Sequence, residues 1–139
     1  MTSSFFTQIG NDIYGKAAGD SSGTSVSLSS DGSVVAIGAI YNEENGYGSG
    51  HVRIYENDGG TWTKIGDDID GEAAYDYSGA AVALSSDGSV IAIGAYGNDD
   101  NGANSGHVRI YQNDGLTWNQ IGSDIDGEAA YDYLGNSVA

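Results

Sequence analysis

Asp and Glu are the most abundant residues of this sequence with ionisable side chains, and therefore the first candidates for chemistry. It carries 20 Asp and Glu residues against 4 Lys and Arg, which gives a net charge of -16. Two acidic segments, 67–72 and 98–102, place side-chain oxygens one or two residues apart next to a glycine. Such oxygens suit calcium, although neither segment completes the twelve-residue calcium-loop pattern. The alternative is a set of turn-forming residues with solvated carboxylates. If calcium binds, we expect its ligands among Asp67, Asp68, Asp70, Asp99 and Asp100.

The charge balance excludes several classes of partner. Four cationic residues cannot replace the counterions of a nucleic acid, so no nucleic acid is expected to bind. Anionic membrane surfaces are disfavoured for the same reason, and no apolar stretch is long enough for membrane insertion. The absence of cysteine rules out disulfides, thiolate zinc sites and thiol nucleophiles. Residues 1–10 lack the parts of a signal peptide, so the sequence leaves the compartment open.

The two histidines, His51 and His107, do not indicate catalysis. They lie 56 residues apart, and each precedes Val and Arg in the same order. A catalytic histidine is expected to be unique, whereas a repeated one is typical of packing between repeats or of pairing with a neighbour. The sequence also lacks a Gly-x-Ser-x-Gly nucleophile elbow and a phosphate-binding glycine loop in the required context. We therefore predict that the protein is not an enzyme.

The histidine spacing belongs to an internal repeat that covers the chain. Residues 10–65 and 66–121 are identical at 37 of 56 positions, and the 139 residues hold about 2.5 copies. Within a copy, apolar residues alternate with polar ones around Val26 and Leu28, run almost continuously over 33–40, and alternate again over 51–55. A fourth segment, 61–65, surrounds Trp62. These patterns predict four β-strands in each repeat.

The connections between the predicted strands differ in length and charge. Short Asp-Gly turns near 30–33 and 57–60 join the first strand to the second and the third to the fourth. Long loops, 41–49 and 67–78, make the other connections. In a four-stranded antiparallel sheet the two long loops emerge at the same edge, and 15 of the 20 acidic residues then lie there. The sequence therefore predicts one elaborate, acidic loop rim.

The loop rim is the surface on which we expect a protein or glycan partner. Its loops combine carboxylates with tyrosines, which are amphipathic and suit interfaces. The alternative is that the tyrosines hold each loop onto its own sheet. The residues expected to contact a partner are Glu43, Glu44, Asp70, Glu72, Tyr75, Asp76, Tyr77, Tyr131 and Tyr133.

Tandem four-stranded units of this length are typical of β-propeller blades. The succession SGAAVA, AIGA, SGHVRIY, IG and GEAA between residues 78 and 130 resembles the integrin-α propeller repeat, also called FG-GAP. The resemblance implies ligand contact at the loop rim and an extracellular or cell-surface location. The chain departs from the family where Ser22, Ser78 and Leu134 replace the aromatic residue, and where the first turn is too short for the family's usual calcium loop.

We therefore expect an all-β fold of tandem four-stranded antiparallel blades that form part of a propeller. The expected segments are a partial blade at 1–21, blades at 22–77 and 78–133, and the first strand of a further blade at 134–139. Residues 5–9 are expected to form a lone fourth strand. Because propellers close with about 4–8 blades, further blades would come from a longer chain or from other copies. The expected function is a non-enzymatic binding or adhesion module, and the alternative is a structural or self-assembling spacer without a specific ligand.

Overall fold

The computed structural model describes residues 5–139, and over this range the chain is all-β. None of these residues forms a helix that could cross a membrane. The strands are β1 (Ser22–Leu28), β2 (Val34–Ala39), β3 (His51–Asp58), β4 (Thr61–Lys64), β5 (Ile69–Asp70), β6 (Ala81–Leu84), β7 (Val90–Ala95), β8 (His107–Asn113), β9 (Trp118–Gln120) and β10 (Ile125–Asp126).

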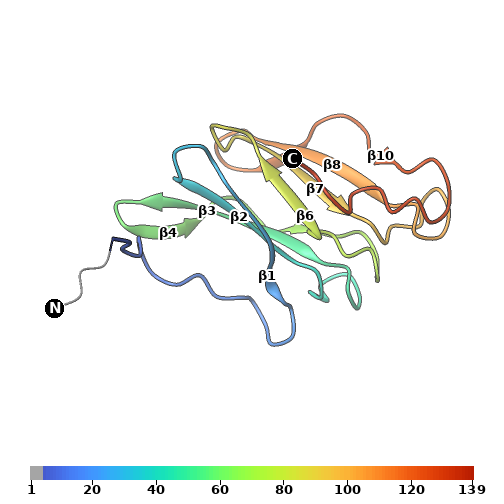
Figure 1. Ribbon diagram of the computed structural model, residues 1–139, viewed down its shortest axis with the longest axis horizontal. Coiled ribbons are helices and arrows are strands. Elements are labelled where there is room, and N and C mark those ends of the chain that lie inside the picture. The colour runs from blue at the N-terminus through green and yellow to red at the C-terminus, as the bar shows by residue number, and fades with distance from the viewer. Residues whose placement is uncertain (1–4) are drawn as a thin grey trace.

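The strands form two antiparallel sheets that follow each other along the chain (Figure 1). The first has the order β1-β2-β3-β4, and β5 also pairs with β3. The second has the order β6-β7-β8, with β9 and β10 both paired with β8. In each sheet the first four strands pair in the order in which they follow each other in the sequence, which is an up-and-down arrangement. This confirms the prediction of an all-β fold built from tandem antiparallel sheets.

The structure differs from the predicted strands in three respects. Each repeat has a short strand that was not predicted, β5 and β10, and positive φ angles at Gly66 and its counterpart Gly122 separate these strands from β4 and β9. Residues 5–9 form no strand; the Ile9 carbonyl instead accepts a hydrogen bond from the Trp62 indole at 2.8 Å. Residues 134–139 form only a parallel bridge between Leu134 and Gly106. In each repeat the first strand pairs with the second strand. Residues 134–139 correspond to a first strand, but the 139 residues contain no third copy of the second strand.

The hydrophobic core lies between the two sheets and is shared by both repeats. Ala36, Val52 and Ile54 of the first sheet are at most 1% exposed, and they belong to one cluster with Ile91 and Ile93 of the second. The second strand is buried on both faces, as its continuous run of apolar residues predicts. The core therefore fixes one repeat against the next as well as each strand within its sheet.

Glycines allow the two sheets to approach at their inner strands. A Cβ atom on Gly38 would lie 2.1 Å from the carbonyl oxygen of Gly79, in the next repeat. That carbonyl accepts a hydrogen bond from the Ser25 hydroxyl at 2.6 Å, and the Ser27 hydroxyl accepts one from the Leu84 amide at 3.0 Å. The repeats are thus joined by close backbone contact and by side chains, and the loops at the end of this junction are held in a fixed relation.

Candidate functional site

The two long loops of each repeat are joined by backbone hydrogen bonds. In the first repeat, the amides of Tyr75 and Tyr77 donate to the carbonyls of Tyr47 and Gly48, each at 2.9 Å. The Asn45 side chain adds a bond of 2.8 Å to the Gly71 carbonyl. The second repeat has the same pattern, with Tyr131 and Tyr133 in place of Tyr75 and Tyr77. These bonds bring tyrosines from distant parts of the sequence together.

Seven tyrosine rings form a continuous row along these loops, which we call the tyrosine row. Neighbouring ring centroids lie between 5.3 Å and 6.4 Å apart, within the range of favourable aromatic contacts. Tyr77 and Tyr96 stack across the junction between the repeats at 5.3 Å. Tyr75 and Tyr131 are 57% and 63% exposed. The row is Tyr41, Tyr47, Tyr75, Tyr77, Tyr96, Tyr131 and Tyr133.

Four members of the tyrosine row have a backbone conformation that is unfavourable for a residue with a side chain. The φ angles of Tyr75 and Tyr131 are 67° and 66°, and those of Tyr77 and Tyr133 are 55° and 53°. At the position equivalent to Tyr75, the earlier copy of the segment has Gly19, with a φ angle of 86°. Glycine takes such angles without steric cost, whereas another residue costs about 1–2 kcal/mol. The tyrosines therefore occupy positions that are poorly suited to them locally.

A cluster of charged groups surrounds His51 in the first repeat. Its Nδ1 atom lies 3.8 Å from Asp68 and 3.9 Å from Asp70, and the side chain is 1% exposed. Three cationic side chains, from Arg53, Lys64 and Lys16, contact the Asp68 carboxylate. The Lys16 Nζ atom also lies 2.8 Å from Glu44. Within this cluster, positive side chains thus neutralise the carboxylates.

Ionisation in the first cluster follows burial and these ion pairs. Burial lowers the pKa of His51 despite the nearby carboxylates, which favours its neutral form at pH 7. Burial raises the pKa of Asp70, and the Asp68 charge raises it further. For Asp68, burial alone would raise the pKa, but Lys64 and Arg53 outweigh it and the pKa is lowered. The geometry therefore stabilises a charged Asp68 beside a neutral imidazole.

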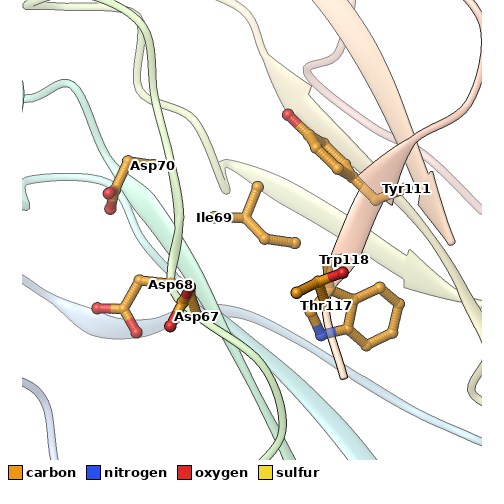
Figure 2. Close-up of a pocket in the computed structure, with 7 residues that line it drawn as sticks. All are labelled: Asp67, Asp68, Ile69, Asp70, Tyr111, Thr117 and Trp118. Atoms are coloured by element: carbon orange, nitrogen blue, oxygen red, sulfur yellow. The ribbon is translucent and has the colours of Figure 1, made fainter. Parts of the chain in front are cut away.

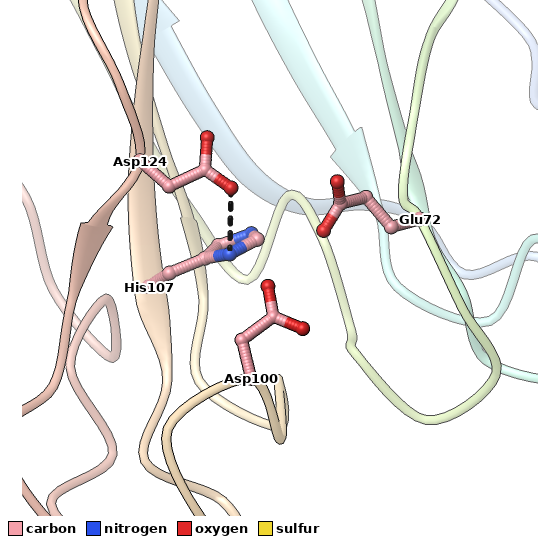
Figure 3. Close-up of side chains that lie close together, drawn as sticks. All are labelled: Glu72, Asp100, His107 and Asp124. Atoms are coloured by element: carbon pink, nitrogen blue, oxygen red, sulfur yellow. Dashed lines mark ion pairs between the residues drawn. The ribbon is translucent and has the colours of Figure 1, made fainter.

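An equivalent cluster surrounds His107 in the second repeat, but its composition differs. Side chains of Glu72, Asp100, His107 and Asp124 each offer one ligand atom, and these atoms lie within 4.8 Å of one another. Figure 3 shows that they come from four separate segments and point toward a common region. Arg109 contacts the Glu72 carboxylate and lies 2.9 Å from Asp124. We call these five residues the His107 cluster.

A groove between the repeats lies beside the cluster that surrounds His51. It is lined by Asp67, Asp68, Ile69 and Asp70 of the first repeat and by Tyr111, Thr117 and Trp118 of the second. Figure 2 shows Ile69 pointing toward Tyr111 and Trp118, while Asp68 and Asp70 point to the other side. The Trp118 indole donates a hydrogen bond of 3.0 Å to the Ile65 carbonyl. This bond links the second repeat to the first beside the groove.

The structure distributes the carboxylates that the sequence predicts for calcium over different places. Asp68 and Asp70 lie with His51, and Asp100 lies in the His107 cluster. Neither Asp67 nor Asp99 belongs to either cluster among the described residues. Asp99 instead accepts a hydrogen bond of 2.7 Å from the Asn104 amide. Both clusters include a histidine, a ligand that the sequence-based prediction did not contain.

Most residues predicted to contact a partner are accessible on the long loops. Asp76 is different: its side chain is 3% exposed and accepts a hydrogen bond of 3.2 Å from Asn98. It therefore holds two loops together and cannot reach a partner. Glu72 belongs to the His107 cluster. The remaining predicted contact residues lie at the loops or beside them, namely Glu43, Glu44, Asp70, Tyr75, Tyr77, Tyr131 and Tyr133.

Sequence reasoning missed the role of His107, Arg109 and Asp124 in one cluster. The signal that could have identified it is the repeat itself. Position 16 of the earlier copy is Lys, whereas the equivalent position 72 is Glu, and Lys64 is replaced by Gln120. Lys16 and Lys64 both contact Asp68. Both changes therefore remove a positive charge from the surroundings of Asp124, the counterpart of Asp68.

Comparisons with known proteins agree with this architecture. Residues 69–111, from β5 to the third strand of the second sheet, match the family model of the FG-GAP repeat. No curated protein sequence matches the chain. Over these residues the chain is similar to the FG-GAP repeat, which is a repeat of the propeller type.

Proposed function

We propose that the chain is a binding module of a propeller-type protein, with adhesion to a cationic protein surface as its role. The contact surface is the loop rim, and the proposed blades are 22–77 and 78–133, flanked by the partial segments 1–21 and 134–139. An extracellular or cell-surface location is part of this proposal, because adhesion requires it. Of the partner classes that the sequence leaves open, the charge of the rim favours a basic protein over a neutral glycan.

The tyrosine row is the observation that carries the proposal. Exposed tyrosines provide a large contact area at low entropic cost, and they are enriched in interfaces. A role confined to the fold does not account for rings such as Tyr47 and Tyr131, which are 54% and 63% exposed. The strained backbone at Tyr75 and Tyr131 also fits a functional position, because strain of this kind concentrates at binding sites.

The charges around the row favour a cationic partner. Lys16, Lys64, Arg53 and Arg109 all contact carboxylates of the chain, so no basic side chain is left to face a partner alone. Guanidinium and ammonium groups of a partner could pair with the remaining carboxylates and also lie over tyrosine rings. Both interactions favour an arginine-rich protein surface.

Binding of a fluorescent arginine-rich peptide, followed by anisotropy, tests the rim. The double variant Glu43→Gln and Glu128→Gln removes two exposed charges from the long loops, and it should weaken binding. The matched control, Glu56→Gln and Asp58→Asn, removes two charges from the third strand, near the short turn, and should change the affinity much less. Equal weakening in both variants would mean that the peptide senses only net charge, which would contradict a specific rim.

A second comparison tests the rings. Tyr47→Ser removes an exposed member of the tyrosine row, whereas Tyr14→Ser removes a tyrosine that is 76% exposed but lies outside the row. We expect only the first substitution to weaken binding of the peptide. Unchanged affinity in Tyr47→Ser would exclude this ring from the contact surface.

The alternative is a structural spacer that assembles with further copies of the repeat. Val26 and Leu28 of β1 are 62% and 60% exposed, whereas their counterparts Val82 and Leu84 pack in or against the core shared with the preceding sheet. The first sheet thus offers an apolar surface of the kind that a further repeat would cover. If neither rim variant changes binding, while Val26→Ser prevents concentration-dependent self-association in sedimentation experiments, the spacer is the better explanation.

A further inference from the structure

We infer that the junction between the two repeats binds a divalent transition-metal cation of the zinc class through Glu72, Asp100, His107 and Asp124. This site is separate from the tyrosine row, and of the carboxylates expected to bind calcium it includes only Asp100. It does not depend on the proposed binding of a cationic protein.

The arrangement of donor atoms is the first support for this site. The three carboxylates and the imidazole come from the segment after β5, the loop between β7 and β8, the start of β8 and the residues before β10. Their ligand atoms all lie within 4.8 Å of one another. Figure 3 shows the four side chains turned toward the same region. Four converging donors match the number that zinc takes in proteins.

The buried imidazole is a second and independent support. His107 is 3% exposed, and its Nδ1 atom has no hydrogen-bond partner in the part of the chain that the structure describes. This atom faces the carboxylates, and lies 3.7 Å from Asp124. A buried nitrogen without a partner is costly. Neutral imidazole is also the commonest protein ligand of transition metals, so a cation here would satisfy the atom.

The first repeat shows where a positive charge is needed. At the equivalent place, the Lys16 ammonium lies 2.8 Å from Glu44 and 3.5 Å from Asp68. The counterparts of these two carboxylates are Asp100 and Asp124, but the counterpart of Lys16 is Glu72. The second repeat therefore replaces a positive group that contacts two carboxylates with a third carboxylate. An oxygen ligand at this position suits a bound cation.

The second cluster also carries more net negative charge than the first. In the first, Lys16, Arg53 and Lys64 contact Glu44 or Asp68, and Asp70 lies beside His51, so three positive charges balance three negative ones. In the equivalent second group, Arg109 is the only cation, because Gln120 replaces Lys64. Four carboxylates oppose it, namely Glu72, Asp100, Asp124 and Asp126. The net charge changes from zero to -3, and a divalent cation would offset most of it.

The donor types favour zinc over calcium. Calcium is usually held by six to eight oxygen atoms, whereas zinc combines imidazole nitrogen with carboxylate oxygen. Arg109, which contacts Glu72 and Asp124, would remain beside the metal and orient these two carboxylates, as groups around metal ligands commonly do.

Isothermal titration calorimetry with Zn²⁺ tests the site in the 139-residue chain. We expect one tight site for each chain, and no competition from millimolar Ca²⁺. Glu72→Lys places the ammonium of the first repeat into the second, so the fold should be preserved while the zinc Kd rises at least about tenfold. Glu44→Gln, which alters the first cluster, is the matched control and should leave the tight site unchanged. Tight binding that survives Glu72→Lys would overturn the inference, as would the absence of any tight site in the unmodified chain.

The reciprocal experiment measures a gain of zinc binding, which a destabilised variant would not produce. Replacing Lys16 by Glu and Lys64 by Gln gives the first cluster the composition of the second, and the number of tight zinc sites should rise from one to two. In parallel, NMR spectra of the two histidine rings should show Zn²⁺ shifting the resonances of one imidazole in the unmodified chain. That ring should be His107, identified by the loss of its signal in His107→Asn. A shift confined to His51, or no second site in the double variant, would contradict the assignment.

Discussion

The side-chain amide of Asn98 donates a hydrogen bond of 3.2 Å to the carboxylate of Asp76, and both side chains are 3% exposed. Asn42 and Asp20 repeat this contact at 3.0 Å. In each case, the long loop between the second and third strands is tied to the segment that precedes the first strand of the same sheet. These bonds fix the positions of the loops that carry the tyrosine row and the His107 cluster.

Asn98→Ala should destabilise the protein by about 1–3 kcal/mol at pH 7, because it leaves a buried carboxylate without its partner. The check is urea denaturation, with Asn119→Ala, on an exposed part of β9, as the control. Burial raises the pKa of Asp76, so the folded state favours the protonated form. The cost should therefore be greatest above this raised pKa and decrease as the pH falls through it, because protonation removes the buried charge. A cost that does not depend on pH would contradict this explanation.

Gly38→Ala should destabilise the junction between the repeats more than a glycine substitution in a turn. The new Cβ atom would lie 2.1 Å from the Gly79 carbonyl oxygen, so the two sheets would have to separate. Overpacking of this kind costs about 1–3 kcal/mol or more. The control is Gly32→Ala, where the φ angle of 73° imposes strain but no atom lies within 4 Å of the new Cβ. Equal free energies of unfolding for the two variants would exclude close packing of the backbones as the reason why position 38 requires glycine.

The strands could be predicted from the sequence because apolar residues alternate or continue over short segments. Val52 and Ile54 point to the core as their spacing predicts, and the second strand is buried on both faces. The ends of the chain could not be predicted in this way. Residues 5–9 repeat the apolar pattern of a fourth strand, but a strand also needs a partner, and the pattern of one segment does not contain that information.

The candidate sites were predicted only in part. The acidic loops and their tyrosines follow from composition and spacing, but the distribution of charges depends on which carboxylates meet in space. Asp76 has the sequence environment of a surface residue, and it is buried because Asn98 reaches it from another loop. Likewise, Glu72 and Asp124 are 52 residues apart, and only the contact between the two sheets brings them together with His107.

Asp87→Asn should reduce the loss of stability in acid. The Asp87 carboxylate accepts hydrogen bonds from the Ser89 amide at 3.0 Å and from the hydroxyls of Ser89 and Ser85. These bonds, led by that of the Ser89 amide, lower its pKa from 3.8 to about 2. A lowered pKa contributes stability above the unfolded value, and this contribution is lost as the pH falls from 3.8 toward 2.

Thermal unfolding between pH 5 and about pH 2 checks this prediction. The unmodified protein should lose melting temperature across this window, and Asp87→Asn should begin lower and lose less. Glu56→Gln, which alters an exposed carboxylate of β3, should keep the acid dependence of the unmodified protein. A parallel loss in Asp87→Asn would mean that other carboxylates dominate the acid transition.

Tyr75→Gly should separate stability from binding. The φ angle of Tyr75 is 67°, and Gly19 occupies the equivalent position of the earlier copy, so glycine removes the strain at this residue. Loss of the ring contact with Tyr47 acts in the opposite direction, but the side chain is 57% exposed and contributes little burial. We therefore expect a free energy of unfolding within about 1 kcal/mol of the original, together with weaker binding of the arginine-rich peptide. A loss of several kcal/mol would instead show that Tyr75 holds its loop onto the sheet, and unchanged peptide binding would remove this ring from the proposed contact surface.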